Sequence, residues 1–267
     1  MAKIPERRIY LPNNISILLY GGSDAGKTVL ASISDDLDPK ELKFVNNALF
    51  IDVEDGMVSH LTRGAGIIVE RFPSDPNEVV DSKEDLGLAI DYLKDNKDRF
   101  EYVSLDSLDR YQEYLVDNML SPTKPRPQIQ DWGDLLISLQ RLGRMAPTWG
   151  VNVVFTCHDT QDVDENDNRV TKRMPLIQGS FRGKVQSYFD VVAYYERIVQ
   201  PDQTIVRRLH TQGSKQFVAR SRLGSCLPEY IDNPTIPGML AEYRKRRRVV
   251  IEEMKKHPGI VITGENS

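Results

Sequence analysis

Cysteine and long apolar segments are both scarce in this sequence, and each shortage excludes a class of protein. The cysteines, Cys157 and Cys226, are far apart and lack the spacing of metal ligands, so we expect buried thiols in a reducing compartment rather than a disulfide framework. No apolar run approaches the roughly 18 residues that span a membrane. Residues 1–10 are polar and lack the apolar core of a signal peptide. The sequence therefore predicts a cytoplasmic protein with no membrane partner.

Positive charge is not in excess either. The 267 residues carry a formal net charge of −4, which argues against a protein whose whole surface binds nucleic acid but is compatible with a local basic groove. There are no internal repeats and no low-complexity tracts. Hydrophobic residues make up 40% of the chain and charged residues 28%, which is ordinary for a globular protein and sufficient for one large core.

Short apolar runs and helical patterns alternate from residue 16 to about residue 195. We expect strands over residues 16–20, 47–53, 66–70, 102–105, 151–156 and 190–195. Helical periods cover residues 27–33, 84–96, 108–120 and 134–145. Such alternation is typical of a mostly parallel central sheet flanked by helices, so the predicted fold class is α/β.

The final part of the chain follows a different pattern. Residues 203–209 and 216–220 alternate and are joined by a Gln212-Gly213-Ser214 turn, which predicts a hairpin at the sheet edge. Residues 237–256 predict a helix whose basic run, Arg244–Arg248, forms either a solvated face or a contact to a phosphate backbone. The last residues predict a loose tail. We therefore divide the chain into an N-terminal extension (1–13), an α/β core (14–235), and a C-terminal basic helix and tail (236–267).

A phosphate-binding motif follows the first predicted strand. Its residues, Gly21, Gly22, Ser23, Asp24, Ala25, Gly26, Lys27 and Thr28, match the pattern G-x-x-x-x-G-K-S/T. Glycines let the backbone fold around phosphate oxygens, while loop amides and the start of the next helix attract the anion. In such a P-loop, Lys27 reaches the β- and γ-phosphates and the Thr28 hydroxyl binds Mg²⁺. The strand before the motif and the helix after it favour this interpretation over a plain glycine turn, and predict ATP and Mg²⁺ as ligands.

Acidic residues end two neighbouring predicted strands. Asp106 follows an apolar strand and is expected to hold Mg²⁺ through a water, as a Walker-B residue does; the alternative is a cap of the next helix. The residue after it is Ser107, so the catalytic base must come from elsewhere. Glu54, at the end of the second strand, is the predicted general base, with Asp52 and Asp55 as substitutes and a solvated acidic turn as the alternative.

These residues resemble the RecA-like branch of the P-loop ATPases, and most closely its compact phage-type members, which are linked to single-strand annealing and recombination. The P-loop, FIDVEDG, YVSLDS, VVFTCH and FVARSRLG carry the resemblance, which covers about residues 14 to 240. It implies a RecA-like ATPase, a homo-oligomer, and the host cytoplasm if a phage encodes the chain. Separate polymerisation and DNA-binding domains are not expected, and neither is strand exchange by a long filament.

The resemblance also implies roles for residues outside the P-loop. His158 would sense the γ-phosphate by a hydrogen bond that is lost on hydrolysis; the alternative is a strand-end histidine that bonds a nearby loop. Arg220 and Arg222 would reach into a neighbouring subunit's nucleotide site and neutralise transition-state charge. Their alternative role is to protect a solvated edge strand against pairing.

Two long segments are candidates for DNA contact. Residues 159–184 follow the strand of His158, where RecA-like recombinases carry a DNA-contacting loop. Their candidates are Arg169, Lys172, Arg173, Arg182 and Lys184 for phosphates and Phe181 for base stacking. The proline-rich segment 121–131 adds Lys124 and Arg126, with Trp132 just after it. A lid over the nucleotide is the alternative for both segments, since long irregular loops are usually functional or mobile.

The leading functional prediction is a Mg²⁺-dependent, DNA-stimulated ATPase that acts on single-stranded DNA in phage-type recombination, annealing or replication. Single-stranded DNA and a single-stranded-DNA-binding protein are the expected partners. A P-loop small-molecule kinase is the second prediction, in which arginines between residues 169 and 182 close over the substrate but Glu54 has no evident role. The third is a nucleotide-switched assembly factor, such as a helicase loader, with slow hydrolysis.

Overall fold

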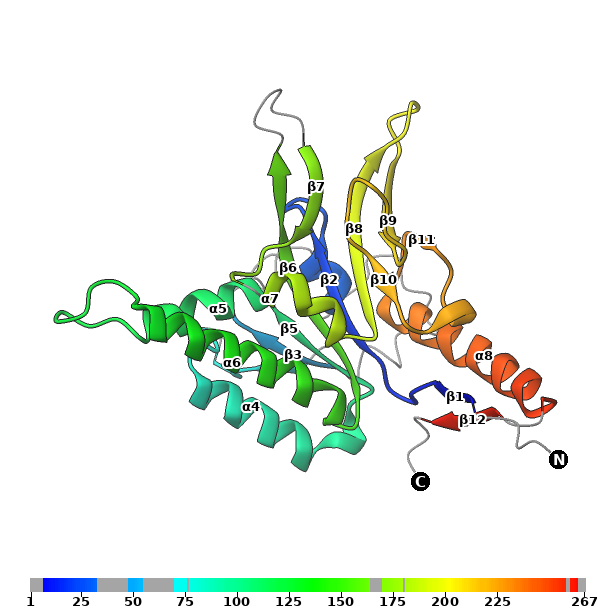
Figure 1. Ribbon diagram of the computed structural model, residues 1–267, viewed down its shortest axis with the longest axis horizontal. Helices are drawn as coiled ribbons and strands as arrows, with labels where there is room; N and C mark the ends of the chain where they lie inside the picture. Colours follow the sequence, from blue (N-terminus) through cyan, green and yellow to red (C-terminus); the bar gives the residue numbers. More distant parts are fainter. Residues whose placement is uncertain are drawn as a thin grey trace.

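A mostly parallel sheet forms the centre of the molecule (Figure 1). The computed structural model describes residues 7–32, 48–54, 70–75, 77–163, 170–179, 181–257 and 260–263. The parallel strands are β2 (Ser16–Gly21), β3 (Ala48–Asp52), β4 (Glu70–Phe72), β5 (Tyr102–Asp106), β6 (Asn152–Val163) and β8 (Val191–Val199). The order in the sheet is β11-β9-β8-β2-β6-β5-β3-β4, which confirms the predicted α/β class.

Helices cover both faces of this sheet, and this explains why its central strands are continuous apolar runs. One face packs against α4 (Lys83–Asp95), α5 (Leu108–Asp117) and α6 (Ile129–Met145), with Leu86, Leu115 and Leu139 in the shared core. The other face packs against α1 (Lys27–Ser32) and α8 (Ile236–Lys255). Every residue of β2 is buried as a result.

Two antiparallel hairpins extend past the carboxyl end of the parallel sheet (Figure 1). In the first, β6 continues beyond His158 and pairs with β7 (Val170–Pro175). In the second, β8 pairs with β9 (Ile205–His210), which also pairs with β11 (Tyr230–Asp232). The prediction that residues 159–184 lack regular structure is therefore wrong in part, because β7 and the short helix α7 (Phe181–Lys184) lie within this segment.

The prediction that residues 203–209 and 216–220 form a hairpin with each other is wrong. Residues 205–210 pair with β8, and the turn between these strands is closed by a hydrogen bond from Gln200 N to Thr204 O of 2.8 Å. β10 (Arg220–Ser221) also pairs with β8, near its first residues. Because β8 runs on to Val199, it is long enough for both strands, and residues 203–209 and 216–220 do not pair with each other.

The predicted loose tail is also wrong in part. Residues 260–263 form β12 (Ile260–Thr263), which pairs in parallel with β1 (Arg7–Tyr10) from the other end of the chain. The backbone groups of each strand thereby find partners that neither segment supplies alone. Within the described residues, no helix is both long and apolar enough to cross a membrane.

Candidate nucleotide site

The carboxyl ends of four parallel strands bring the predicted site residues together. The register aligns Gly21 of β2 with His158 of β6, and Asp52 of β3 with Asp106 of β5. In a parallel sheet, residues that follow different strands meet at one edge, which is where ligands bind in open α/β folds. The site is therefore assembled from segments that lie far apart in the sequence.

The P-loop turns tightly at this edge. Gly21 cannot carry a side chain, because a Cβ there would lie 2.1 Å from the Tyr195 carbonyl oxygen, and Gly26 has a φ of +90°, a conformation that favours glycine. Lys27 is only 5% exposed, and its Nζ donates to Gly21 O at 3.0 Å and to Gly22 O at 2.9 Å. The ammonium group is thus held within the loop, where a phosphate would be bound.

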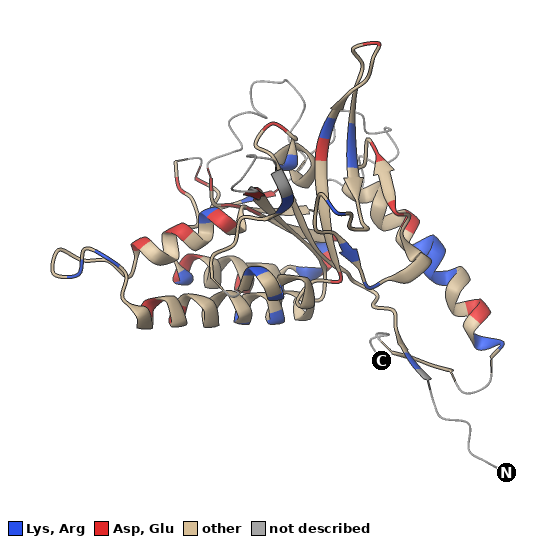
Figure 2. Ribbon diagram, turned by 45° about the horizontal axis from the view of Figure 1, so that its top comes forward, with Lys and Arg blue, Asp and Glu red and all other residues tan. Residues whose placement is uncertain are grey.

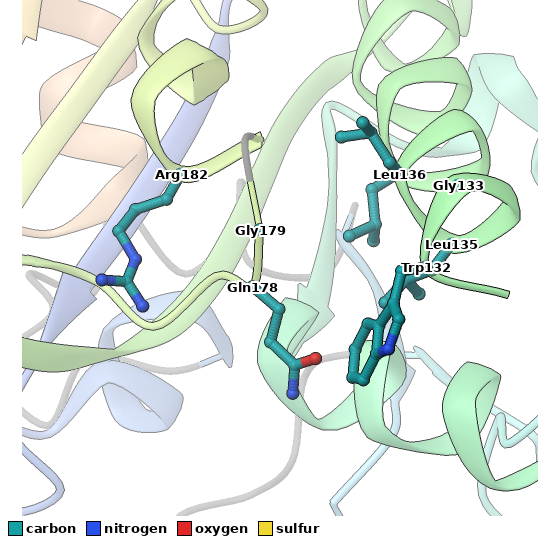
Figure 3. A pocket seen from close by; sticks show the side chains of 8 residues that line it. Trp132, Gly133, Leu135, Leu136, Gln178, Gly179 and Arg182 are labelled. Carbon is teal, nitrogen blue, oxygen red and sulfur yellow. The ribbon is translucent and has the colours of Figure 1, made fainter. Parts of the chain in front are cut away.

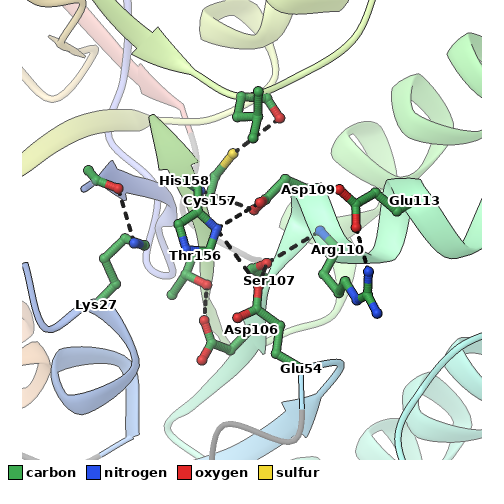
Figure 4. Close-up of polar contacts among 12 residues, drawn as sticks. Lys27, Glu54, Asp106, Ser107, Asp109, Arg110, Glu113, Thr156, Cys157 and His158 are labelled. Atoms are coloured by element: carbon green, nitrogen blue, oxygen red, sulfur yellow. Dashed lines mark hydrogen bonds and ion pairs between the residues drawn. The ribbon is translucent and has the colours of Figure 1, made fainter. Parts of the chain in front are cut away.

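A cavity of about 200 Å³ lies in front of the P-loop. It is lined by Ser23, Gly26, Lys27, Thr28, Val29, Glu54, Asp106 and His158. Figure 4 shows the side chains of Lys27, Glu54, Asp106 and His158 approaching this region from separate elements. Every residue predicted for the metal or for catalysis within one subunit borders this cavity.

Asp106 has the environment of a metal anchor. Its side chain is buried, and Oδ1 accepts a hydrogen bond from Thr156 Oγ1. Oδ2 is buried and has no hydrogen-bond partner among the residues that the structure describes. Burial raises the pKa of Asp106 to about 6, and the Thr156 and Thr28 hydroxyls oppose that rise.

The donor set therefore fits Mg²⁺, which prefers oxygen ligands and keeps several waters. The unpartnered Asp106 oxygen and the Thr28 hydroxyl border the same cavity and would hold the ion. The alternative role of Asp106 as a helix cap does not apply, because the side chain that caps α5 is Ser107.

Glu54 is held at the cavity by the residue after Asp106. Ser107 Oγ donates to Glu54 Oε1, and the Glu54 backbone N–H donates to Asp52 Oδ1 at 3.2 Å. Asp52 is fully buried and forms an ion pair with Arg71, with 2.9 Å between Oδ2 and Nε. Asp52 is therefore engaged in the scaffold, while Asp55 lies outside the described residues. Of the described candidates for the general base, Glu54 is therefore the one that borders the cavity.

His158 is oriented by Asp109, a residue that the sequence did not single out. Asp109 accepts from the His158 backbone N–H at 3.0 Å and contacts the ring Nδ1 at 2.8 Å. This hydrogen bond raises the pKa of His158, against the opposing effect of burial. Burial alone would raise the pKa of Asp109, but the bonds from His158 outweigh it and the pKa lies below its ordinary value.

Glu54 belongs to the same cluster, because its Oε1 lies 3.9 Å from His158 Nδ1. Ligand atoms of Glu54, Asp109 and His158 all lie within 4.8 Å of one another, a spacing that a cation could bridge. The only sequence signal for Asp109 was an acidic residue in the first turn of the helix after Asp106.

Arg207 is a second residue that sequence reasoning missed. It lies on β9, and its Nε donates to the carbonyl of Ala25 in the P-loop at 3.2 Å. A Cβ on Gly26 would come within 3.1 Å of the same nitrogen. The contact depends on the pairing of β9 with β8, which the sequence pattern did not predict.

Arg220 and Arg222 lie at the amino end of β8, at the opposite end of the parallel strands from the P-loop. β10 pairs with the first residues of β8, with Arg220 opposite Val192. Arg220 Nη1 donates to Gln186 O at 3.3 Å, and Arg222 Nη2 donates to Ser187 O. The structure does not bring these arginines to the P-loop of their own chain.

The predicted DNA-contacting residues divide into several groups. Phe181 is 1% exposed and packs against Tyr188, with 5.1 Å between ring centroids, so the prediction that it stacks on bases is wrong. Arg173 pairs with Asp159 at 2.6 Å, and Arg182 Nε donates to Ile177 O at 3.0 Å. The side chains of Lys172 and Lys184 are exposed, and Arg169 lies outside the described residues.

The proline-rich segment lies beside a second cavity. Lys124 pairs with Asp131 at 2.5 Å, which ties this segment to the start of α6. Trp132, 43% exposed, borders a cavity of about 550 Å³ that is also lined by other residues of α6 and by Gln178, Gly179 and Arg182. Figure 3 shows the Gln178 amide directed toward the Trp132 ring, with Arg182 extending away from it.

Comparisons with known proteins identify a family. A family model described as an AAA domain matches residues 13–223. No curated protein matches the sequence. Among solved structures, the flagellar accessory protein FlaH from Methanocaldococcus jannaschii is similar at 10% identity and a TM-score of 0.35, over 75% of this chain and 78% of that chain.

Proposed function

Because the chain belongs to the AAA-domain family, we propose that it hydrolyses ATP with Mg²⁺ and that single-stranded DNA stimulates this turnover. One observation carries the proposal of hydrolysis: Lys27, Thr28, Asp106, Glu54 and His158 border the same cavity. Phosphate binding requires Lys27, and metal binding requires Thr28 and Asp106. Hydrolysis requires Glu54 and His158 in addition.

The roles of the residues follow from their contacts. Lys27 binds the phosphates, and Thr28 and Asp106 hold Mg²⁺, which supplies positive charge to the phosphate oxygens. Glu54 accepts the proton of a water whose oxygen forms a bond to the γ-phosphorus, while the bond from that phosphorus to the bridging oxygen breaks. His158 has its Nδ1 engaged by Asp109, which leaves Nε2 as the ring nitrogen available to a phosphate oxygen.

Support for DNA as the effector comes from the continuity of β6. The strand carries His158 at the nucleotide site and then extends into the β6–β7 hairpin, whose Lys172 is exposed. A phosphate backbone bound along this hairpin would act on the same strand that positions His158. Trp132 supplies an exposed ring for stacking, and the buried Gln178 Oε1 beside it has no partner among the described residues.

The test is the rate of ATP turnover with and without single-stranded DNA, at a low and a high salt concentration. We expect DNA to raise the rate and salt to weaken the effect, because phosphate contacts release counterions. Lys27→Ala, which removes the charge from the P-loop, serves as the inactive control. Turnover only with a small-molecule acceptor would indicate a kinase, and slow turnover that DNA leaves unchanged would indicate an assembly factor.

We extend the proposal to an oligomer in which Arg220 and Arg222 act on a neighbouring subunit. Both arginines bond backbone carbonyls, and no carboxylate in the described part of the chain lies within ion-pair distance of either. Arg222→Ala and Lys27→Ala should each be inactive alone, and mixing them should restore activity at sites that combine an intact P-loop with an intact arginine. Mixtures that stay inactive would contradict action between subunits. Recombination or annealing in the cytoplasm, with a single-stranded-DNA-binding protein, is the corresponding biological setting.

A further inference from the structure

The edge of the sheet opposite the P-loop has a basic cavity that ATP hydrolysis does not use. The cavity, of about 300 Å³, is lined by Asn13, Asn14, Arg244, Arg247 and Arg248. Asn14 precedes β2, so the cavity lies at the amino end of the strand whose carboxyl end leads into the P-loop. Figure 2 shows Lys and Arg gathered around the middle of α8.

The three arginines converge because of their spacing on α8. Positions 244, 247 and 248 are related by three and four residues, so they share one face of the helix. Arg247 is held in place by donating through Nε and Nη2 to Leu11 O at 3.1 and 3.0 Å. Arg244 forms an ion pair with Glu101. Arg248 has no hydrogen-bond or ionic partner in the part of the chain that the structure describes.

Arg248 supplies the available positive charge of this cavity. Three guanidinium groups border the cavity; that of Arg244 pairs with Glu101, and that of Arg248 has no ionic partner among the described residues. The charge of Arg248, together with the side-chain amides of Asn13 and Asn14, provides donors in a concave site. Guanidinium groups match the geometry of phosphate oxygens and form strong hydrogen bonds with them.

A second cavity adjoins the first at Asn13 and Asn14. It has a volume of about 360 Å³ and is otherwise lined by Tyr10, Pro12, Pro147, Thr148 and Gly150, none of which is charged. Asn14 Nδ2 donates to Gly150 O at 2.7 Å and fixes the boundary between the two cavities. The Tyr10 side chain is 47% exposed, so its ring is accessible to a planar group.

We propose that this pair of cavities is a phosphate-binding site separate from the P-loop. Arg244, Arg247 and Arg248 bind a phosphate group, and the uncharged half next to Tyr10 accommodates the sugar or base that carries it. The phosphate belongs either to a nucleic-acid strand or to a free phosphate compound. The inference is independent of ATP hydrolysis and of its stimulation by DNA.

The test compares Arg248→Gln with Arg246→Gln. Both changes remove one arginine from α8, but Arg246 lies two positions away on the helix, outside the cavity, and pairs with Glu242. One probe is a fluorescein-labelled oligothymidylate followed by anisotropy. The other is inorganic pyrophosphate followed by calorimetry, in a Lys27→Ala background that weakens the P-loop. Because Arg248 has no partner among the described residues, its loss should leave folding and DNA-independent ATP turnover unchanged.

Arg248→Gln should weaken the probe that matches the natural ligand by about tenfold, the effect of one charged hydrogen bond, while Arg246→Gln changes it less than about twofold. If binding of the oligothymidylate is weakened, the ligand is a nucleic-acid strand. The slope of the logarithm of its binding constant against the logarithm of the salt concentration should then also fall in magnitude by about one. If pyrophosphate alone is affected, the ligand is a free phosphate compound. Equal behaviour of the two variants with both probes would overturn the site.

The outcome does not depend on the proposed ATPase mechanism. A protein whose turnover ignores DNA, but whose Arg248→Gln variant still binds a probe more weakly than Arg246→Gln, would refute the effector and retain this site. If DNA stimulates both variants equally and both variants bind both probes equally, the DNA effector would be retained and this site would be refuted.

Discussion

Two buried aspartates lie at opposite edges of the sheet, and their surroundings differ. Asp190, directly before β8, accepts bonds at Oδ2 from the Ser16 backbone N–H and hydroxyl, both at 2.9 Å. Ser16 Oγ in turn receives a bond from the Asp190 backbone N–H at 3.0 Å. Asp106, at the end of β5, has an Oδ2 with no partner among the described residues. Burial raises the pKa of both carboxyl groups.

The comparison shows that burial alone does not distinguish a site from a scaffold. Buried polar atoms are normally hydrogen-bonded, because an unpartnered one costs about 1–3 kcal/mol. The bonds of Asp190 join β2 to β8 and account for its burial. The unmet oxygen of Asp106, beside a lysine and a glutamate in a cavity, is accounted for by a ligand that the folded chain is built to receive.

The largest effect should come from replacing Glu54, which borders the same cavity as Asp106. Glu54→Gln should keep ATP binding and lower turnover by about a thousandfold, because general-base catalysis contributes roughly 10²–10⁴. Single-turnover kinetics together with nucleotide binding would measure it. Glu113→Gln, a change to an exposed acid that pairs with Arg110, is the control and should leave turnover unchanged. Normal hydrolysis by Glu54→Gln would assign the base elsewhere.

The two aspartates themselves should respond in opposite ways. Asp106→Asn should lower turnover by about a hundredfold, as expected for the loss of a charge that acts on the metal. Asp190→Ala should leave the turnover of folded protein intact but lower the free energy of unfolding by about 2 kcal/mol, because the Ser16 donors lose their acceptor. Denaturant unfolding and turnover on the same samples measure both. A stability loss confined to the Asp106 variant would contradict the comparison.

The pH dependence sharpens the contrast. Without magnesium and nucleotide, the Asp106 pKa of about 6 in the folded chain exceeds its ordinary value of 3.8, so folding favours the protonated form. That stabilisation is fully present below the ordinary pKa and is lost as the pH rises through about 6. Relative to Asp106→Asn, the wild type should therefore lose on the order of 3 kcal/mol between about pH 4 and about pH 7. Parallel stability curves for the two proteins would argue against this protonation.

Asp109→Asn should have a smaller effect on the same edge. The variant weakens the hold on His158, and we expect turnover to fall about tenfold, equivalent to about 1.4 kcal/mol for a charged hydrogen bond. The pKa of His158 should also fall toward its ordinary value, because Asp109 raises it in the wild type. NMR titration of the ring measures this. Asp117→Asn, at the exposed end of α5, should change neither quantity.

The smallest expected effect concerns Arg207. Arg207→Gln removes the bond to Ala25 O and should weaken ATP binding by about fivefold, equivalent to about 1 kcal/mol. The adjacent Arg208 pairs instead with Asp232, at 2.6 Å, so Arg208→Gln is the matched control. Equal nucleotide affinity in the two variants would show that the contact with the P-loop has no role in binding.

Much of the nucleotide edge could be predicted from the sequence because its signals are local. The pattern of residues 21–28 encodes a phosphate loop through the conformations that glycine allows and the reach of Lys27. Asp106 and Glu54 were located by the apolar strands that end beside them, since each strand carries its own signal of burial. The α/β class follows from the same alternation, and the structure confirms it.

Partners across the sheet were decided only by tertiary structure. Phe181 is as suitable for stacking as any exposed aromatic residue until packing against Tyr188 buries it. The choice of β8 rather than residues 216–220 as the partner of β9 brings Arg207 to the P-loop, and the first turn of α5 brings Asp109 to His158. A residue's own sequence neighbourhood specifies its backbone conformation and its tendency to be buried. The groups that meet it across a sheet depend on the packing of the whole chain.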